Sequence, residues 1–134
     1  MKGKYLLDTN TVIDMLKARR GIQRQIVEHG PQNCYVSDIT ISELMTGYYL
    51  SGNPTEMKDI SFVKENFTLL RVTPSVLDRF AEFRARLHKK GCPIPALDLM
   101  ILATAADNEL IPVSHDSHFS VIPELKSEDW TECQ

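Results

Sequence analysis

The sequence has few cysteines, three in 134 residues, and none of them shows the Cys-x-x-Cys spacing of thiolate metal sites. An odd number of cysteines argues against a disulfide framework, so we expect Cys34, Cys92 and Cys133 to be reduced thiols. Long apolar runs are also missing: no stretch approaches the roughly 20 apolar residues of a membrane helix. The apolar run that ends at Asp8 is too short for a signal peptide. The sequence therefore predicts a cytoplasmic protein without a membrane segment.

An excess of positive charge is absent as well. Lysine and arginine number 15 against 18 acidic residues, for a net charge of −3. Because phosphate neutralisation drives much of nucleic-acid affinity, this balance does not support a general phosphate clamp. It does not exclude a metal-dependent nuclease, since a metal-binding acidic cluster lowers the net charge of such an enzyme. The length and the hydrophobic fraction of 43% predict one globular domain over residues 1–134.

Short apolar segments alternate with segments of helical periodicity. Strands are expected at 4–7, 34–36, 67–72 and 111–114, with a short last strand at 121–122. Helices are expected from 9 to a break at 20–21, and then over 22–29, 38–50, 55–66, 74–90 and 95–108. Trp130 is expected to anchor a tail that otherwise frays over 127–134. This order predicts an α/β fold: three α/β/α layers around a mostly parallel sheet of four to five strands.

Four carboxylates stand beside these apolar segments: Asp8, Glu43, Asp98 and Asp116. Asp8 and Asp116 follow predicted strands, and Glu43 and Asp98 fall in the first turns of predicted helices. Sites in parallel sheets form beyond the carboxyl ends of the strands, so all four could converge there. Each acid also has an ordinary reading. Asp8 could cap a helix, Glu43 could face solvent, and Asp116 could belong to a turn.

Asp98 is the hardest of the four to explain by structure alone. It shares a helix face with Ile101, Leu102 and Ala105. The helix dipole favours an acid in the first turn by only about 0.3–1 kcal/mol. Burial of an unpaired charge costs several kcal/mol. A divalent cation would compensate several such charges, and hard ions such as Mg²⁺ prefer carboxylate oxygen and water.

Four segments of the chain carry a resemblance to a known family. They are Leu6-Leu7-Asp8-Thr9-Asn10, Ser42-Glu43-Leu44-Met45-Thr46-Gly47, Pro95 to Ala105, and Val113 to Phe119. With these segments in this order, the chain resembles the PIN-domain ribonucleases, and most closely the VapC-like toxins of bacterial and archaeal toxin–antitoxin pairs. The resemblance covers about residues 4 to 119. The segment around Asp98 is fairly specific, whereas an apolar-Asp-Thr start is weak by itself.

The resemblance implies that Asp8, Glu43, Asp98 and Asp116 bind Mg²⁺ or Mn²⁺. It also implies a hydrolase, an endoribonuclease that blocks translation by cutting single-stranded segments of tRNA or rRNA. The resemblance further implies two partners: a second copy of the chain in a homodimer and a cognate antitoxin protein.

Further residues gain a role only from the resemblance. Thr9, Asn10 and Ser114 match positions near the metal, where hydroxyls or an amide order ligands or water. Gly47 matches a small residue that lets a neighbour approach closely. Ser114 stands where threonine is commoner, and His115 and His118 flank Asp116 in a variable loop.

Other readings remain open. A haloacid-dehalogenase-like phosphatase would need a second acid where Asn10 stands. A receiver-like signalling domain would need an acidic neighbour for Asp8 and a lysine after a late strand, and both are missing. A PIN-like RNA-binding or RNA-processing protein without a toxin role is the nearest alternative, together with an inactive binding module. Two apolar stretches are either core or partner surface. They are Val12, Ile13, Met15 and Leu16, and Met45, Tyr48, Tyr49 and Leu50.

Overall fold

A computed structural model describes residues 3–132, and its centre is a parallel four-stranded sheet. The strands are β1 (Tyr5–Leu7), β2 (Cys34–Ser37), β3 (Thr68–Leu70) and β4 (Ile111–Val113), in the spatial order β3-β2-β1-β4. Leu7 pairs in register with Val36 of β2 and with Val113 of β4. The sequence prediction of a parallel α/β sheet is confirmed, with four strands among the described residues.

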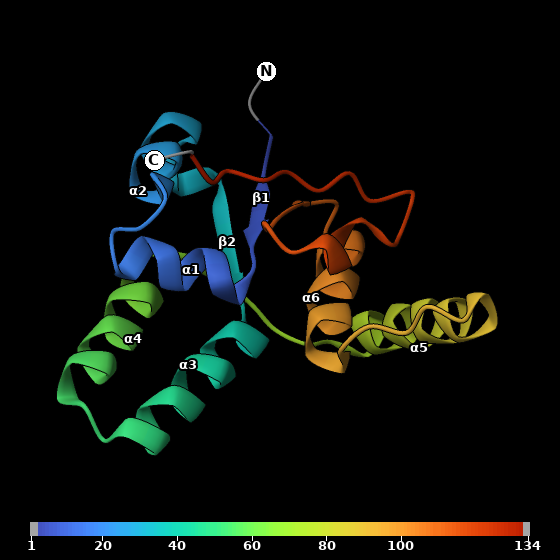
Figure 1. Cartoon of the computed structure of the whole chain (residues 1–134), viewed down its shortest axis with the longest axis horizontal. Helices are drawn as coiled ribbons and strands as arrows, with labels where there is room; N and C mark the ends of the chain where they lie inside the picture. Colours follow the sequence, from blue (N-terminus) through green and yellow to red (C-terminus); the bar gives the residue numbers. More distant parts are fainter. Residues whose placement is uncertain (1–2, 133–134) are drawn as a thin grey trace.

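Helices cover both faces of this sheet, as Figure 1 shows with the strands between α1, α2 and α4 on one side and α5 and α6 on the other. The α-helices of the described chain are α1 (Thr9–Leu16), α2 (Ile22–His29), α3 (Asp38–Ser51), α4 (Pro54–Asn66), α5 (Pro74–Lys90) and α6 (Ala96–Asp107). Two short 3-10 helices follow α2 and β4, namely η1 (Pro31–Asn33) and η2 (Ser117–Ser120). The predicted three layers are therefore present.

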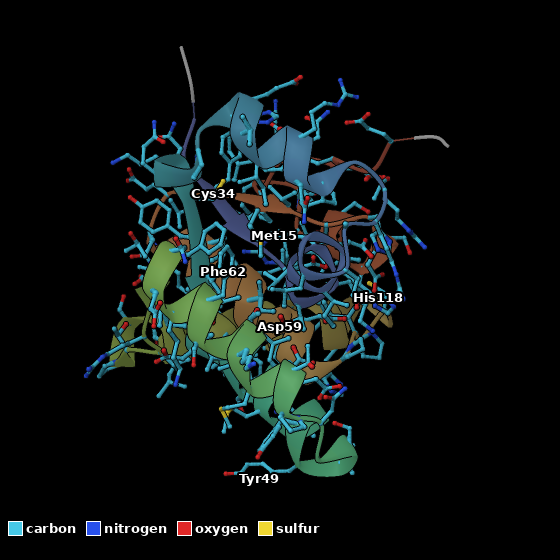
Figure 2. All side chains as sticks on the ribbon, turned by 90° about the vertical axis from the view of Figure 1, so that its left-hand side faces the viewer. Met15, Cys34, Tyr49, Asp59, Phe62 and His118 are labelled. Atoms are coloured by element: carbon cyan, nitrogen blue, oxygen red, sulfur yellow. The ribbon has the colours of Figure 1, made fainter. Side chains whose placement is uncertain are left out.

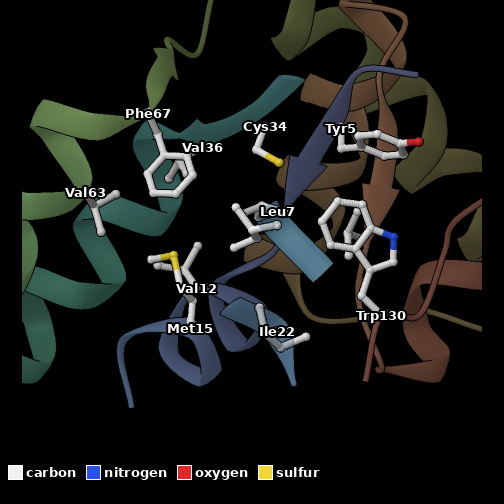
Figure 3. Close-up of a cluster of buried hydrophobic side chains, with 12 residues drawn as sticks. Tyr5, Leu7, Val12, Met15, Ile22, Cys34, Val36, Val63, Phe67 and Trp130 are labelled. Atoms are coloured by element: carbon white, nitrogen blue, oxygen red, sulfur yellow. The ribbon is translucent and has the colours of Figure 1, made fainter. Parts of the chain in front are cut away.

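The central strand β1 supplies side chains to both hydrophobic clusters. Tyr5 and Leu7 point into the cluster beneath α1, α2 and α4, shown in Figure 3, and Leu6 points into the cluster beneath α5 and α6. All three side chains are buried. Successive residues of a strand face opposite sides of the sheet, so the helices must cover both faces of β1. This burial on both faces explains why β1 is continuously apolar rather than alternating.

Local capping sets where the helices begin and end. Thr73 caps α5 by accepting a hydrogen bond from the Val76 amide at 3.2 Å, and Pro74 occupies the first helical position as expected. Gly91 ends α5 in a left-handed conformation, at φ +71°. At α1 the cap is the one that the sequence offered as the ordinary reading of the first acid. Asp8 itself is the N-cap, and its side chain accepts from the Thr11 amide.

The C-terminal segment differs from its prediction. Residues 121–122 form no strand; they lie in a bend after η2, with Ile122 fully buried. The expected fraying is also wrong for residues 127–132. Glu128 bonds the backbone of β4, since its amide donates to the Pro112 carbonyl and its carbonyl accepts from the Ser114 amide, each at 2.9 Å. Trp130 anchors the tail as predicted: it stacks on His29 with ring centroids 4.0 Å apart and contacts Tyr5 edge-on.

The helices and the cysteines of residues 3–132 bear on the expectations about membrane segments and disulfides. Each helix within residues 3–132 is too short or too polar to cross a lipid bilayer. Cys34 and Cys92 are both free thiols, and Cys133 lies outside the described residues. Burial raises the pKa of the Cys34 thiol to about 12, so this cysteine is an unreactive part of the core.

Candidate functional site

The first acid of the predicted set, Asp8, lies at the carboxyl end of β1 and is only 3% exposed. Its Oδ1 accepts from the Thr11 amide at 2.7 Å, and its Oδ2 accepts from the Ser114 hydroxyl at 2.6 Å. Thr11 is in turn held by its hydroxyl, which donates to the Val113 carbonyl. Two neighbouring strand ends therefore fix this carboxylate in one orientation.

Ser114 links Asp8 to the next acid along the sheet. Its hydroxyl oxygen accepts from the Asp116 amide at 2.9 Å while the same hydroxyl donates to Asp8. Asp116 then caps η2, because its Oδ1 accepts from the His118 amide at 2.9 Å. The hydroxyl at position 114 thus orders both the first and the fourth predicted acid.

Asp98, Asp116 and His118 form a cluster of possible metal ligands. One donor atom from each side chain lies within 4.8 Å of the others. His118 Nδ1 is 3.3 Å from Asp98 Oδ2 and 3.3 Å from Asp116 Oδ1. Asp98 comes from the first turn of α6 and the other two from the segment after β4, so residues distant in sequence meet at one edge of the sheet.

Glu43 reaches the same edge from α3. Its Oε1 accepts a hydrogen bond of 2.6 Å from the Thr9 hydroxyl, and Thr9 directly follows Asp8. The Thr9 hydroxyl also lies 3.0 Å from the hydroxyl of buried Thr40, one turn before Glu43 on α3. Glu43 is therefore held beside the residue that follows Asp8, outside the group of Asp98, Asp116 and His118, and it lines a small cavity of about 130 Å³.

The electrostatics of the site favour a bound cation. Burial raises the pKa of Asp8 above its usual range, in spite of the hydrogen bonds from Ser114 and Thr11. Burial raises the pKa of Asp98 too; the hydrogen bond from His118 opposes this rise, and the negative charge of Asp116 adds to it. Within residues 3–132 no lysine or arginine nitrogen lies within 4.0 Å of any of the four carboxylates. These are oxygen donors whose charge is balanced by no lysine or arginine among the described residues, and hard divalent ions prefer such donors.

Two positions that the resemblance singled out, Asn10 and Gly47, have no close contacts among the residues that the structure describes that explain them. The side chain of Asn10 is exposed on α1 and forms no hydrogen bond with the residues described, so its role stays a prediction. A methyl group at Gly47 would meet its nearest side-chain atom, from Glu56, at 3.7 Å. That is ordinary contact, so no side chain among residues 3–132 approaches Gly47 closely enough to require glycine.

The two apolar stretches separate into core and surface. Val12 and Met15 are core residues beneath the sheet. Tyr49 and Leu50 are 75% and 85% exposed at the end of α3, where Figure 2 shows Tyr49 extending from the body of the molecule. An apolar groove of about 430 Å³, lined in part by Met15 and Phe62, opens on the face of Figure 2, and none of the four acids lines it.

Sequence reasoning missed two polar residues near this edge. Thr40 is fully buried and contacts Thr9, and its place one turn before Glu43 was the available signal. Asp14 is 6% exposed within α1, between Ile13 and Met15. It carries the same signal as the four acids, a charge set in an apolar segment.

The arrangement matches a known family over most of the chain. The family model of the PIN domain matches residues 5–125. The chain belongs to the PIN-domain family, as its sequence segments and its parallel sheet with acids at the carboxyl edge had predicted.

Two curated relatives and one solved structure make the comparison more specific. Ribonuclease VapC2 of Haemophilus influenzae is 33% identical over 132 residues, covering 95% of this chain and 98% of the relative. The tRNA(fMet)-specific endonuclease VapC of Salmonella typhimurium is 30% identical, with the same coverage. A crystal structure of DNA-bound VapBC from Salmonella typhimurium has a TM-score of 0.82 and 27% identity, covering 97% of this chain and 99% of that one.

Proposed function

We propose that this protein is an endoribonuclease that hydrolyses RNA phosphodiester bonds and acts as the toxin of a toxin–antitoxin pair. The observation that carries this proposal is the meeting of Asp98, Asp116 and His118 at the edge where Ser114 holds Asp8 and Thr9 holds Glu43. Relatives that cover nearly the whole chain are named as ribonucleases, one of them specific for a tRNA. We infer tRNA or rRNA as the substrate class and the cytoplasm as the place of action.

Mg²⁺ or Mn²⁺ is the cofactor that suits these side chains, with Asp8, Asp98, Asp116 and Glu43 as the residues that would hold it. When bound, such an ion lowers the pKa of water and offsets the charge that develops on the phosphate. The protein's own part is to hold the carboxylates in place before RNA arrives. Asp8 is fixed by two hydrogen bonds, and Glu43 is oriented by Thr9. The half-exposed side chains of Asp98 and Asp116 leave the site open to a phosphate from solvent.

The partner proposed for this chain is a cognate antitoxin protein, together with a second copy of the chain as a homodimer. The similar solved structure is of VapBC bound to DNA, so the comparison supports a protein partner for this fold. Tyr49, Leu50 and the groove beside Phe62 offer exposed apolar area for such contacts. The alternative, an RNA-processing protein without a toxin role, is not favoured because the curated relatives are VapC ribonucleases.

The test of this function compares two acids on the same helix. Asp98→Asn should abolish RNA cleavage by the purified protein, because it removes a charge from the cluster with little change in volume. Asp107→Asn is the matched control: Asp107 ends α6 in an ion pair with Arg79 at 3.0 Å, away from the cluster, and this variant should cleave normally. EDTA should stop cleavage by the unchanged protein.

The toxin role has its own readout. Expression of the unchanged chain without a partner should arrest growth, and Asp98→Asn should relieve the arrest while Asp107→Asn should not. Cleavage that persists in EDTA or in Asp98→Asn would contradict the metal site. Cleavage in vitro without any effect on growth would contradict the toxin role and leave the nuclease chemistry standing.

A further inference from the structure

A fifth acid, Asp14, is buried in α1, and one oxygen of its carboxylate has no hydrogen-bond partner among the residues that the structure describes. It is 6% exposed, and its Oδ2 accepts no hydrogen bond from any of residues 3–132. Two cationic or potentially cationic side chains face it: His115 Nε2 at 3.6 Å and Arg20 Nε at 4.0 Å. Because a buried carboxylate is costly without partners, its presence here requires an explanation beyond packing.

The corner between α1 and α2 is strained in a way that brings Arg20 to Asp14. Ala18 and Arg20 adopt left-handed backbone conformations, at φ 52° and 57°, which residues other than glycine rarely do. Such conformations persist only where surrounding contacts enforce them. Here the Arg19 amide donates to the Asp14 carbonyl, and the Glu132 amide donates to the Arg20 carbonyl, each at 2.8 Å. The corner around Asp14 is therefore held from two sides.

His115 connects Asp14 to the acidic cluster. It directly precedes Asp116, in the segment 114–118 that also carries His118. The Ser114 hydroxyl fixes the start of this segment to Asp8. Contact of His115 with Asp14 provides a second attachment at the next residue, directly before Asp116, and this attachment is to the middle of α1. With both attachments, the backbone at Asp116 is held at two adjacent points.

We propose that Asp14 is a positioning residue: its buried carboxylate, between Arg20 and His115, fixes the segment 114–118 and so sets the affinity of the acidic cluster for a divalent cation. This inference rests on the proposed function, because it concerns the same cluster. In this proposal Asp14 is not a ligand of the cation. It acts through His115 on Asp116 and His118.

The test measures the segment and the cation separately. In metal-free protein, Asp14→Ala should speed hydrogen exchange of the Asp116, His118 and Phe119 amides about tenfold or more relative to the unchanged chain. The same variant should weaken Mn²⁺ binding, followed by electron paramagnetic resonance, by roughly 10- to 100-fold, the range typical for partners of metal ligands. Asp14→Asn keeps an acceptor for a His115 N–H and should recover most of both properties.

His115→Ala approaches the same contact from the other side and guards against an Asp14 variant that fails to fold, since the His115 side chain is 26% exposed. It should reproduce the effect of Asp14→Ala, and the double variant should be no worse than either single one. Ile26→Val, a truncation in the core beneath α2, is the matched control for general destabilisation and should leave Mn²⁺ affinity unchanged.

Two failures are distinguishable. If Asp14→Ala and His115→Ala both fold and keep the amide exchange and Mn²⁺ affinity of the unchanged protein, the positioning role is overturned. If the unchanged protein binds no Mn²⁺, the proposed metal-dependent function is overturned instead. The exchange comparison reveals which has failed because it requires no metal.

Discussion

The two halves of the acidic site differ in how firmly the protein holds them. Asp8 is 3% exposed and receives hydrogen bonds from a helix amide and from Ser114. Asp98, Asp116 and His118 have side chains 26%, 29% and 42% exposed, and His118 lies 3.3 Å from each of the two carboxylates. One half is built into the sheet before any ligand arrives, whereas the other half faces solvent. In the proposed function, the rigid half supplies the reference position and the open half is where a phosphate would enter.

The largest effect is expected from breaking the rigid half. Asp8→Asn should reduce RNA cleavage more than about 100-fold, since even the partners of metal ligands are commonly worth 10- to 100-fold. The fold should survive, because asparagine keeps the volume and can still accept from the Thr11 amide. Cleavage rates and the thermal midpoint of the metal-free protein measure the two outcomes. If the variant cleaves RNA at the normal rate, Asp8 is not part of the active site.

The link between the halves should give an intermediate effect. Ser114→Ala removes the hydroxyl that donates to Asp8 and accepts from the Asp116 amide, so cleavage should fall roughly 10- to 100-fold. Ser114→Thr keeps the hydroxyl and should cleave within a few-fold of the unchanged protein. Titration of Mn²⁺ in the cleavage assay shows whether the loss lies in cation affinity. Equal rates for alanine and threonine at this position would mean that the hydroxyl does not matter.

The smallest effect concerns pH and stability. The pKa values of Asp8 and Asp98 are raised in the folded protein by burial, so folding favours their protonated forms. The stability they contribute is full below the ordinary pKa of 3.8 and is lost as the pH rises through the higher folded values. The metal-free protein should therefore lose stability from acid to neutral pH, and Asp8→Asn should flatten this loss.

A bound cation should reverse that loss where the carboxylates are ionised. Mn²⁺ at a hundredfold excess over its dissociation constant should stabilise the folded protein by about 2.7 kcal/mol at neutral pH, and by less in acid. Thermal unfolding at several pH values, with and without Mn²⁺, gives both quantities. Stabilisation that is equal at pH 4 and pH 7 would contradict binding by these carboxylates.

The fold was largely predictable because its signals are local. Apolar runs flanked by caps and breakers marked all four strands and the helices, as with Thr73-Pro74 before α5 and Gly91 after it. The same reasoning failed at residues 121–122 and in the expected fraying of the tail, where the burial of Ile122 and the backbone bonds of Glu128 depend on segments far away in sequence. Local pattern cannot reveal contacts whose partners lie across the molecule.

The site was predictable in its acids and not in the contacts that connect them. A charge beside an apolar run singled out Asp8 and Asp98, and parallel-sheet topology indicated where they would meet. The pairing of His118 with two carboxylates depends on the turn after Asp116, and the Thr40–Thr9 contact depends on how α3 packs against α1. Asp14 lies in an apolar segment as the other acids do, but the sequence does not show that its Oδ2 is buried without a hydrogen-bond partner among the described residues.

The hydrogen bond between Ser114 and Asp8 also has a consequence for synthesis on the ribosome, because its partners are 106 residues apart. At translation rates of about 5–20 residues per second, roughly 5–20 s pass between the appearance of the first partner and that of the second. During that interval β1 has no β4 neighbour, and Asp8 has no serine to orient it. The acidic edge is therefore completed only after residues 114–118 have been made, long after Asp8 has left the ribosome's catalytic centre.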